Sequence, residues 1–154
     1  MLDIIHRDSR TIAVNKPAGM LVHRSWLDKH ETRFAVQTLR DQIGQHVYPV
    51  HRLDRPTSGV LLFALDTEAA RLLTQQFENK TIEKTYWAIV RGHLPSDGLI
   101  DYALKYMPDK IAEAQTEATL QEAQTAYRCL AQTELPFQSA LLYPTSRYSW
   151  AKLT

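Results

Sequence analysis

Short apolar runs separated by polar turns characterise the start of the chain. Residues 2–5 and 11–14 are two such runs, and the polar residues 8–10 lie between them. Residues 16–19 read Lys-Pro-Ala-Gly, and proline at the second position with glycine at the fourth favours a type I turn. Residues 20–23 resume an extended pattern. The sequence therefore predicts two strands, a turn and a further extended segment.

A helical spacing replaces this pattern between residues 31 and 42. Ala35, Leu39 and Ile43 are four positions apart, so they share one face of a helix. Gly44 follows, and glycine is the preferred residue just beyond a helix. We therefore predict a helix over residues 31–42 that ends near Gly44.

Residues 59–65 form a continuous apolar run of strand length, which predicts a strand covered on both faces. The polar residues 66–68 can cap a helix and suit its positive end. One helical face then follows, formed by Ala69, Leu72, Leu73, Gln76 and Phe77. Residues 86–90 predict another strand, ended by Arg91-Gly92. This order indicates an α/β or α+β layer with a crossover helix packed on a sheet.

The last third of the chain is less regular. Residues 95–98 are expected to form a loop, and residues 105–124 are polar and rich in Ala, Gln and Glu, so we expect an exposed segment that is helical in part. Residues 125–132 and 147–153 predict two more strands. The sequence contains no internal repeat or linker, so we expect a single domain over residues 1–154.

The composition is that of a globular protein, with 44% hydrophobic and 23% charged residues. The net charge of +1 gives no general case for nucleic-acid binding, so any basic patch must be local. Cys129 is the single cysteine, which excludes an intramolecular disulfide and fits a reducing compartment. The chain shows no signal peptide and no apolar run of membrane-spanning length. We therefore expect a cytoplasmic protein with no membrane contact.

The segment from residue 50 to residue 65 places a charged cluster directly before the predicted buried strand. Asp54 lies between Arg52 and Arg55, and Pro56 stiffens the turn that follows. A carboxylate on rigid backbone at the edge of a core is a candidate nucleophile. The alternative is a surface ion-pair cluster at a turn, which has no chemical role.

Two aromatic segments are further candidates. In a strand, Lys84, Tyr86 and Ala88 share one face, so the Tyr86 ring can stack on a planar ligand or can be an ordinary core aromatic. Residues 23–26, His-Arg-Ser-Trp, combine basic and aromatic side chains. They can hold a phosphate or stack on a base, and they are equally ordinary as a surface loop.

The histidines do not predict a metal site. His51 and Asp54 are close in sequence, but the other histidines are scattered without the spacing of a ligand set. Those others are His6, His23, His46 and His93. We expect no metal.

Three segments together resemble the RluA-type pseudouridine synthases. The run HRLDRPTSGVLLFAL resembles the signature of that family, in which Thr-Ser-Gly stands three residues after an Arg-Leu-Asp core. The segments VNKPAGMLVH and EKTYWAIVRG resemble its lysine-proline-glycine turn and its lysine-x-tyrosine strand. The similarity runs from about Leu2 to about Leu153 and is weakest across the polar segment. The segments LVHRSWLD and TLRDQIGQHV are similar to the branch that modifies tRNA.

The resemblance implies the isomerisation of uridine to pseudouridine in RNA, without a cofactor. It implies an α+β fold, with a mixed, largely antiparallel sheet and flanking helices. It implies that Asp54 is the catalytic aspartate, attacking either C6 of uracil or C1′ of the ribose. Arg52 matches the arginine that helps to open the RNA and bind the substrate, and Tyr86 matches the tyrosine that stacks on uracil and takes part in proton removal. The expected partner is RNA, with tRNA as the substrate and no obligate protein partner.

The chain departs from the family pattern at its end. Family members continue into a Thr-Gly-Arg-x-His-Gln-x-Arg stretch that supplies a basic partner for the catalytic aspartate, whereas this chain ends at RYSWAKLT. We therefore expect a fold that is incomplete at the C-terminus and a chain that is a poor or inactive enzyme by itself. The alternatives are a non-catalytic RNA-binding remnant and a synthase that acts on rRNA.

Overall fold

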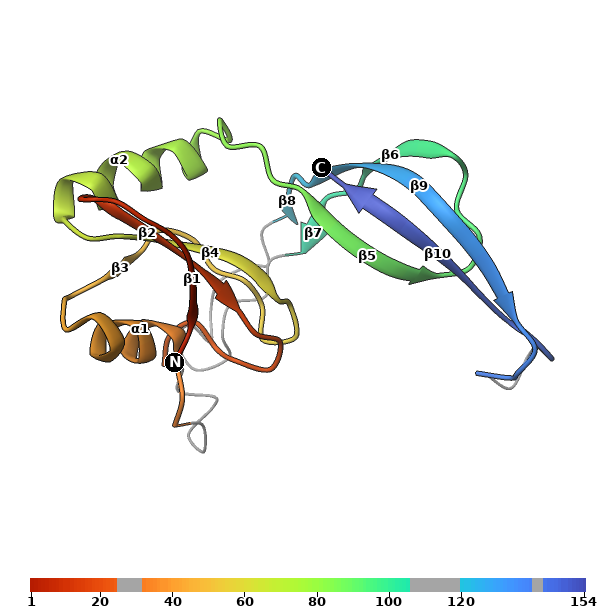
Figure 1. The fold of residues 1–154 in the computed structure, drawn as a ribbon. Helices are drawn as coiled ribbons and strands as arrows, with labels where there is room; N and C mark the ends of the chain where they lie inside the picture. The colour runs from red at the N-terminus through yellow and green to blue at the C-terminus, as the bar shows by residue number, and fades with distance from the viewer. Residues whose placement is uncertain (25–31, 106–119, 140–142) are drawn as a thin grey trace, which may run out of the picture. The chain divides into compact units, whose positions relative to one another are not determined.

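The computed structural model describes residues 1–24, 32–105, 120–139 and 143–154 (Figure 1). The chain divides into two compact units, Met1–Ile82 and Glu83–Thr154, and each is considered by itself. The single domain predicted over residues 1–154 stays a prediction.

The first unit contains a four-stranded antiparallel sheet in the order β1-β2-β4-β3. Its strands are β1 (Asp3–Arg7), β2 (Thr11–Lys16), β3 (Tyr48–Pro49) and β4 (Gly59–Ala64). The turn at residues 8–10 is closed by the Asp8 carboxylate, which accepts the backbone N–H groups of Arg10 and Thr11. The strands predicted at residues 2–5, 11–14 and 59–65 are therefore confirmed, with shifts of one or two residues at their ends.

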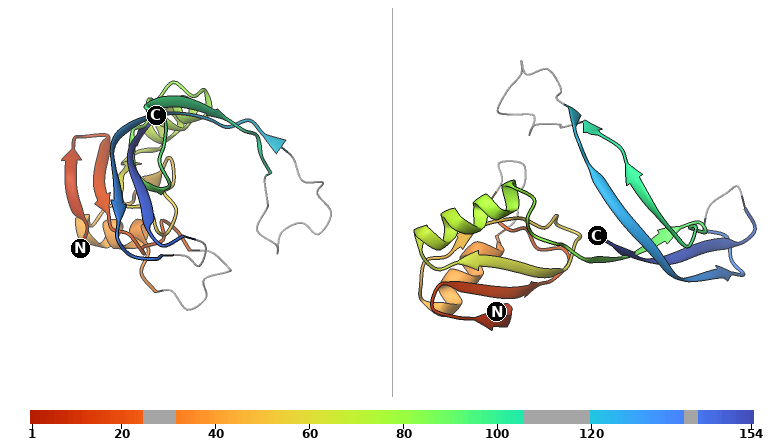
Figure 2. Two further views of the ribbon diagram at one scale, coloured as in Figure 1. Left: turned by 90° about the vertical axis from the view of Figure 1, so that its right-hand side faces the viewer. Right: turned by 90° about the horizontal axis from the view of Figure 1, so that it is seen from above.

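Helices α1 (Ala35–Ile43) and α2 (Thr67–Glu78) cover opposite faces of this sheet (Figures 1 and 2). Leu61 and Phe63 of β4 are buried in the cluster that contains residues of α1, whereas Ala64 is buried in the cluster that contains residues of α2. Successive side chains of a strand point to opposite faces, so β4 contributes to both layers. The prediction of a strand covered on both faces is confirmed, except at the exposed Val60.

Most of the predicted helix ends are confirmed. Asp66 is the N-cap of α2, and its carboxylate accepts the backbone N–H of Ala69. Gly44 ends α1 with a φ of 65°, a left-handed conformation that glycine adopts without strain. Helix α1 begins at Ala35, later than predicted, because the preceding Phe34 has an extended backbone.

Two local predictions in this unit are wrong. The extended segment predicted at residues 20–23 is reduced to an isolated parallel bridge between Leu21 and Phe34, and residues 22 and 23 form a bend. Leu72 is exposed rather than on the buried face of α2, because Ala69, Leu73 and Phe77 pack against the sheet instead.

The second unit contains a four-stranded antiparallel sheet in the order β5-β10-β9-β6 and a two-stranded sheet, β7-β8. The strands are β5 (Tyr86–Arg91), β6 (Asp97–Asp101), β7 (Leu104–Lys105), β8 (Leu120–Gln121), β9 (Gln124–Leu135) and β10 (Ser146–Leu153). The strands predicted at residues 86–90, 125–132 and 147–153 are confirmed. The loop predicted at residues 95–98 is partly wrong, because β6 begins at Asp97.

The prediction that α2 is a crossover between two strands of one sheet is wrong. Helix α2 packs on the first sheet, but β5 does not return to that sheet and pairs with β10 in the second one. The polar segment predicted as partly helical lies mostly outside the described residues, and its described ends form β7 and β8. With two helices and antiparallel sheets among the described residues, the predicted α+β class is confirmed.

Candidate active site

The loop between β3 and β4 exposes Asp54 on a firmly anchored backbone. Val50 and Leu53 are both buried, so they hold the loop against the core. The Thr57 backbone N–H donates to the Asp54 carbonyl at 3.0 Å and closes the following turn. The Asp54 side chain, in contrast, is 76% exposed. Its carboxylate is therefore open to a ligand while its backbone is fixed.

A second turn, at residues 16–19, braces this loop. The Gly19 backbone N–H donates to the Arg55 carbonyl at 2.7 Å, and the Arg55 Nε donates back to the Gly19 carbonyl at 3.1 Å. Gly19 has a φ of 86°, which a residue with a side chain adopts only at a cost. The predicted Lys-Pro-Ala-Gly turn thus supports the loop that carries Asp54.

Lys16 is a charged residue buried at the junction of the two turns. Its Nζ donates to the Met20 carbonyl at 2.8 Å, the Pro17 carbonyl at 3.1 Å and the Arg55 carbonyl at 3.4 Å. Burial lowers the pKa of Lys16, and the charge of Asp54 acts in the opposite direction. Sequence reasoning interpreted this segment only as a turn. The missed signal was a lysine at the end of a strand with an apolar centre, followed at once by proline.

Arg52 and Asp54 lie together but form a loose pair. The Arg52 Nη2 lies 3.8 Å from the Asp54 Oδ1, and both side chains are largely exposed. Exposed pairs of this kind contribute little to stability, typically about 0–1 kcal/mol. The surface ion pair considered as an alternative therefore exists, but it leaves both groups accessible to a substrate.

His51 anchors the same loop to the neighbouring strand and helix. Its Nε2 accepts the Leu62 backbone N–H at 3.0 Å, and its ring stacks on Phe77 of α2 with centroids 4.6 Å apart. An N–H donated to Nε2 requires that this nitrogen carries no proton. The ring therefore links the loop before Asp54 to both β4 and α2, which gives His51 a positioning role.

Tyr86 lies in the second unit, at the start of β5, where it is paired with Leu153 of β10. It is 37% exposed, so it is not a fully buried core aromatic. The face it shares with Ala88 is more covered than the face of Ile89. The structure thus brings Arg52, Asp54 and Lys16 together within the first unit, and places Tyr86 in the second.

The His-Arg-Ser-Trp cluster cannot be followed in full, because residues 25–31 lie outside the described residues. Within the described part of the chain, no group of three or more His, Cys, Asp or Glu residues is arranged to hold a metal ion. No described helix is long and apolar enough to cross a membrane.

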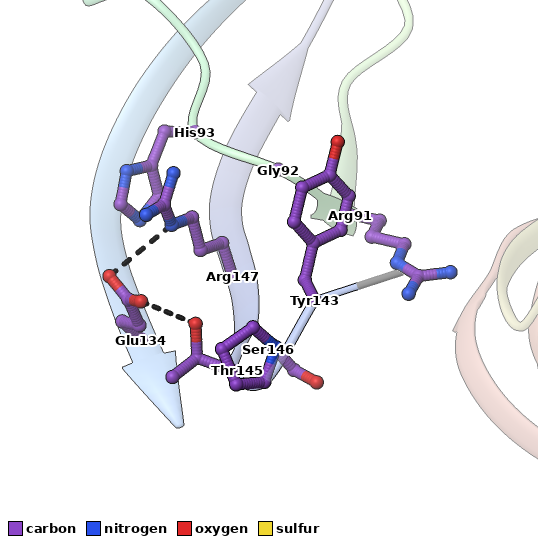
Figure 3. A pocket seen from close by; sticks show the side chains of 9 residues that line it. Arg91, Gly92, His93, Glu134, Tyr143, Thr145, Ser146 and Arg147 are labelled. Atoms are coloured by element: carbon purple, nitrogen blue, oxygen red, sulfur yellow. Dashed lines mark hydrogen bonds and ion pairs between the residues drawn. The ribbon is translucent and has the colours of Figure 1, made fainter. Parts of the chain in front are cut away.

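A cavity that the sequence did not predict lies in the second unit, between the end of β5 and the β9–β10 connection (Figure 3). Its volume is about 660 Å³. It is lined by Arg91, Gly92, His93, Glu134, Tyr143, Pro144, Thr145, Ser146 and Arg147. The lining residues come from three separate parts of the chain, residues 91–93, residue 134 and residues 143–147. Strand pairing in the second sheet brings these parts together.

Comparison with known proteins connects these features to RNA modification. Residues 10–154 match the RNA pseudouridylate synthase family. The chain is 63% identical over 154 residues to tRNA pseudouridine synthase C of Pasteurella multocida (strain Pm70), covering 99% of this chain and 63% of the relative. It is 58% identical to the protein of the same name from Haemophilus influenzae (strain ATCC 51907 / DSM 11121 / KW20 / Rd), of which it covers 64%. The chain thus spans slightly less than two thirds of the length of these relatives.

Solved structures show the same architecture. Human RNA Pseudouridylate Synthase Domain Containing 4 is 26% identical, with a TM-score of 0.63 over 98% of this chain and 57% of that protein. Human RNA Pseudouridylate Synthase Domain Containing 1 is 24% identical, with a TM-score of 0.69 over 99% of this chain and 59% of that protein. The second likeness supports the fold alone.

Proposed function

Because the chain belongs to the RNA pseudouridylate synthase family, we propose that its protein isomerises uridine to pseudouridine in tRNA. The family indicates RNA as the substrate class. The names of the matched relatives favour tRNA over rRNA. We further propose that the reaction takes place in the cytoplasm. Because the product is an isomer of the substrate, the reaction consumes no co-reactant, and we propose that it uses no cofactor.

The observation that carries this proposal is the exposed carboxylate of Asp54 on a loop fixed by buried neighbours and paired turns. In the reaction, the bond between uracil N1 and ribose C1′ breaks, and a bond between C5 and C1′ forms. The proton on C5 is lost and N1 gains one, so atoms balance without a co-reactant. Asp54 acts as the nucleophile, at C6 of uracil or at C1′ of the ribose.

The neighbouring groups suit this role. A base inside an RNA helix has to leave the stack before a side chain can reach it. Arg52, close to Asp54 and exposed, is suited to hold the RNA backbone in the opened form. Lys16 is buried at the junction of the two turns, and its positive charge and the charge of Asp54 attract each other.

Tyr86 is proposed to stack on the uracil and to take part in proton removal at C5. Its partial exposure leaves the ring available for a planar ligand, and its hydroxyl group can act as an acid or base. This assignment comes from the lysine-x-tyrosine strand.

The test is Asp54→Asn in the protein expressed from its whole reading frame. Pseudouridine formation is measured in single-turnover reactions on tRNA and on rRNA transcripts, with Asp41→Asn as the control for a lost surface acid. We expect Asp54→Asn to slow the reaction at least about a thousandfold, because the nucleophile is removed. Folding should be unchanged, since the side chain is largely exposed.

The outcomes separate the alternatives. Turnover on rRNA but not on tRNA would redirect the substrate assignment. RNA binding by the wild type without turnover on either RNA would support a non-catalytic RNA-binding protein. Normal turnover by a folded Asp54→Asn protein would overturn the role of Asp54.

A further inference from the structure

Two buried serine side chains fix segments that adjoin the cavity in the second unit. Ser146, at the start of β10, is almost fully buried. Its Oγ donates to the Phe137 carbonyl at 2.7 Å and accepts the Ser139 backbone N–H at 2.9 Å. These bonds fix the end of the β9–β10 connection onto the sheet. One wall of the cavity is therefore preorganised.

Ser149 fixes the opposite wall in the same way. Its Oγ donates to the Gly92 carbonyl at 2.8 Å and accepts the Leu94 backbone N–H at 2.9 Å. The Gly92 backbone N–H donates in turn to the Arg147 carbonyl at 2.8 Å. The loop that carries His93 is thus tied to β10. A cavity with both walls fixed loses little conformational freedom when a ligand binds.

Three of the nine residues that line the cavity have basic side chains. Arg91, His93 and Arg147 are the basic groups, and Glu134 is the one acid among the lining residues. A hydrogen bond from Thr145 and the nearby charge of Arg147 lower the pKa of Glu134, so the carboxylate is ionised at neutral pH. The Arg147 Nε lies 3.3 Å from the Glu134 Oε2. Glu134 therefore orients Arg147 and offsets the charge of only one of the two arginines.

The cavity also offers an aromatic surface. Tyr143 is 67% exposed, and in Figure 3 it lies between Arg91 on one side and the Glu134–Arg147 pair on the other. Arg91 Nη2 donates to the Ser139 Oγ at 3.3 Å, which holds its guanidinium near the rim. A guanidinium carries five N–H donors. Arg91, bonded to Ser139, and Arg147, paired with Glu134, therefore each keep donors that can bind an anion.

We propose that this cavity binds the RNA substrate outside the reacting uridine, with Arg91 and Arg147 on backbone phosphates and Tyr143 stacked on a base. Arginine forks match phosphate oxygens, and an exposed aromatic ring is a sequence-tolerant platform for a base. The proposal rests on RNA being the substrate. It explains why basic and aromatic side chains gather here in a chain whose net charge is only +1.

The test measures tRNA binding at several salt concentrations by the protein expressed from its whole reading frame. Arg91→Gln and Arg147→Gln should each weaken binding and reduce the slope of log K against log salt by about 1. Tyr143→Leu should weaken binding about tenfold with little change in the slope. Arg71→Gln is the control, because it removes a surface arginine from the helix of the other unit.

Two further variants have expected effects of their own. Arg91→Lys should recover much of the salt slope, since an ammonium group still pairs with a phosphate. Glu134→Gln should strengthen binding, because it removes the one acid among the described residues that line the cavity. Circular dichroism checks that each variant is folded.

The binding readout is independent of catalysis. If the pocket variants bind tRNA like the wild type, with unchanged salt slopes, the proposed RNA site is wrong. If the variants lose binding as expected but the wild type isomerises no uridine, the RNA site stands and the proposed function fails.

Discussion

The two compact units of the chain are stabilised by different kinds of interaction. In Met1–Ile82, helices cover both faces of the sheet, and all of the described apolar residues that are buried, except Ala151, lie there. In Glu83–Thr154, the most buried side chains besides Ala151 are Ser146 and Ser149. The candidate nucleophile is therefore carried by an apolar core, whereas the basic cavity depends on buried hydrogen bonds.

Several large apolar side chains of the second unit are exposed rather than buried. Trp87, Ile89 and Trp150 are 60%, 77% and 48% exposed, and the two indole rings contact each other with centroids 5.1 Å apart. A sheet with such side chains on an open face gains little from apolar burial. Strand pairing and polar contacts must supply most of the stability of this unit taken by itself.

The comparison is tested most directly by removing one large apolar side chain from each unit. Phe63→Ala should lower the free energy of unfolding by about 3–5 kcal/mol, because Phe63 is fully buried between β4 and the α1 layer. Ile89→Ala should change it by no more than about 0.5 kcal/mol, because Ile89 is exposed. Urea unfolding followed by circular dichroism measures both. Equal losses would contradict the difference between the units.

Tyr86→Phe tests whether the open second unit contributes to the chemistry. Removing the hydroxyl should slow pseudouridine formation about a hundredfold or more and leave RNA binding largely intact, because the ring remains. Single-turnover rates and tRNA affinity are compared with those of Tyr102→Phe, an exposed tyrosine of the same unit. A loss of thermal stability with normal turnover would instead show that Tyr86 is only a packing residue.

Ser149→Ala tests the buried hydrogen bonds of the second unit. The substitution leaves the Leu94 N–H and the Gly92 carbonyl without their partner, which costs about 1–3 kcal/mol. The same variant should weaken tRNA binding, because the loop that carries His93 loses its tie to β10. Ser96→Ala, at an exposed serine, is the control for both measurements. Unchanged stability would show that the buried serines do not support this unit.

Local patterns predicted most of the elements in both units. The continuous apolar run of β4, the Asp66 cap and the Gly44 stop depend on neighbouring residues, and each was found where the sequence indicated. The connection after α2 was not predictable in this way. Strand–helix–strand order does not encode which strand β5 pairs with, and its partner, β10, lies more than fifty residues along the chain.

The candidate site could be proposed from the sequence in part, also because of local patterns. The family signature and the turn residues indicated Asp54 and Arg52 because both lie within one short segment. The buried Lys16 was not recognised as part of the site, since its contact with Arg55 joins distant segments. The cavity beside Arg91 also depends on strand pairing, so no local pattern could reveal it.

Asp66→Asn tests how far charge contributes to the apolar unit, and its expected effect is small. The Arg10 guanidinium, which lies 3.0 Å from the Asp66 carboxylate, and the donated N–H of Ala69 lower the pKa of Asp66 below its usual 3.8. The unfolded chain therefore binds the proton more readily. The carboxylate stabilises the fold above pH 3.8, and this contribution is lost as the pH falls through the lowered pKa.

Asparagine keeps an oxygen to cap α2 but removes the charge, so the difference between wild type and variant should be largest at neutral pH and should disappear in acid. Thermal unfolding from pH 7 to pH 2, with Asp41→Asn as the control for a lost surface acid, measures this difference. A gap that persists in acid would mean that the cap geometry, and not the charge, is what Asp66 contributes.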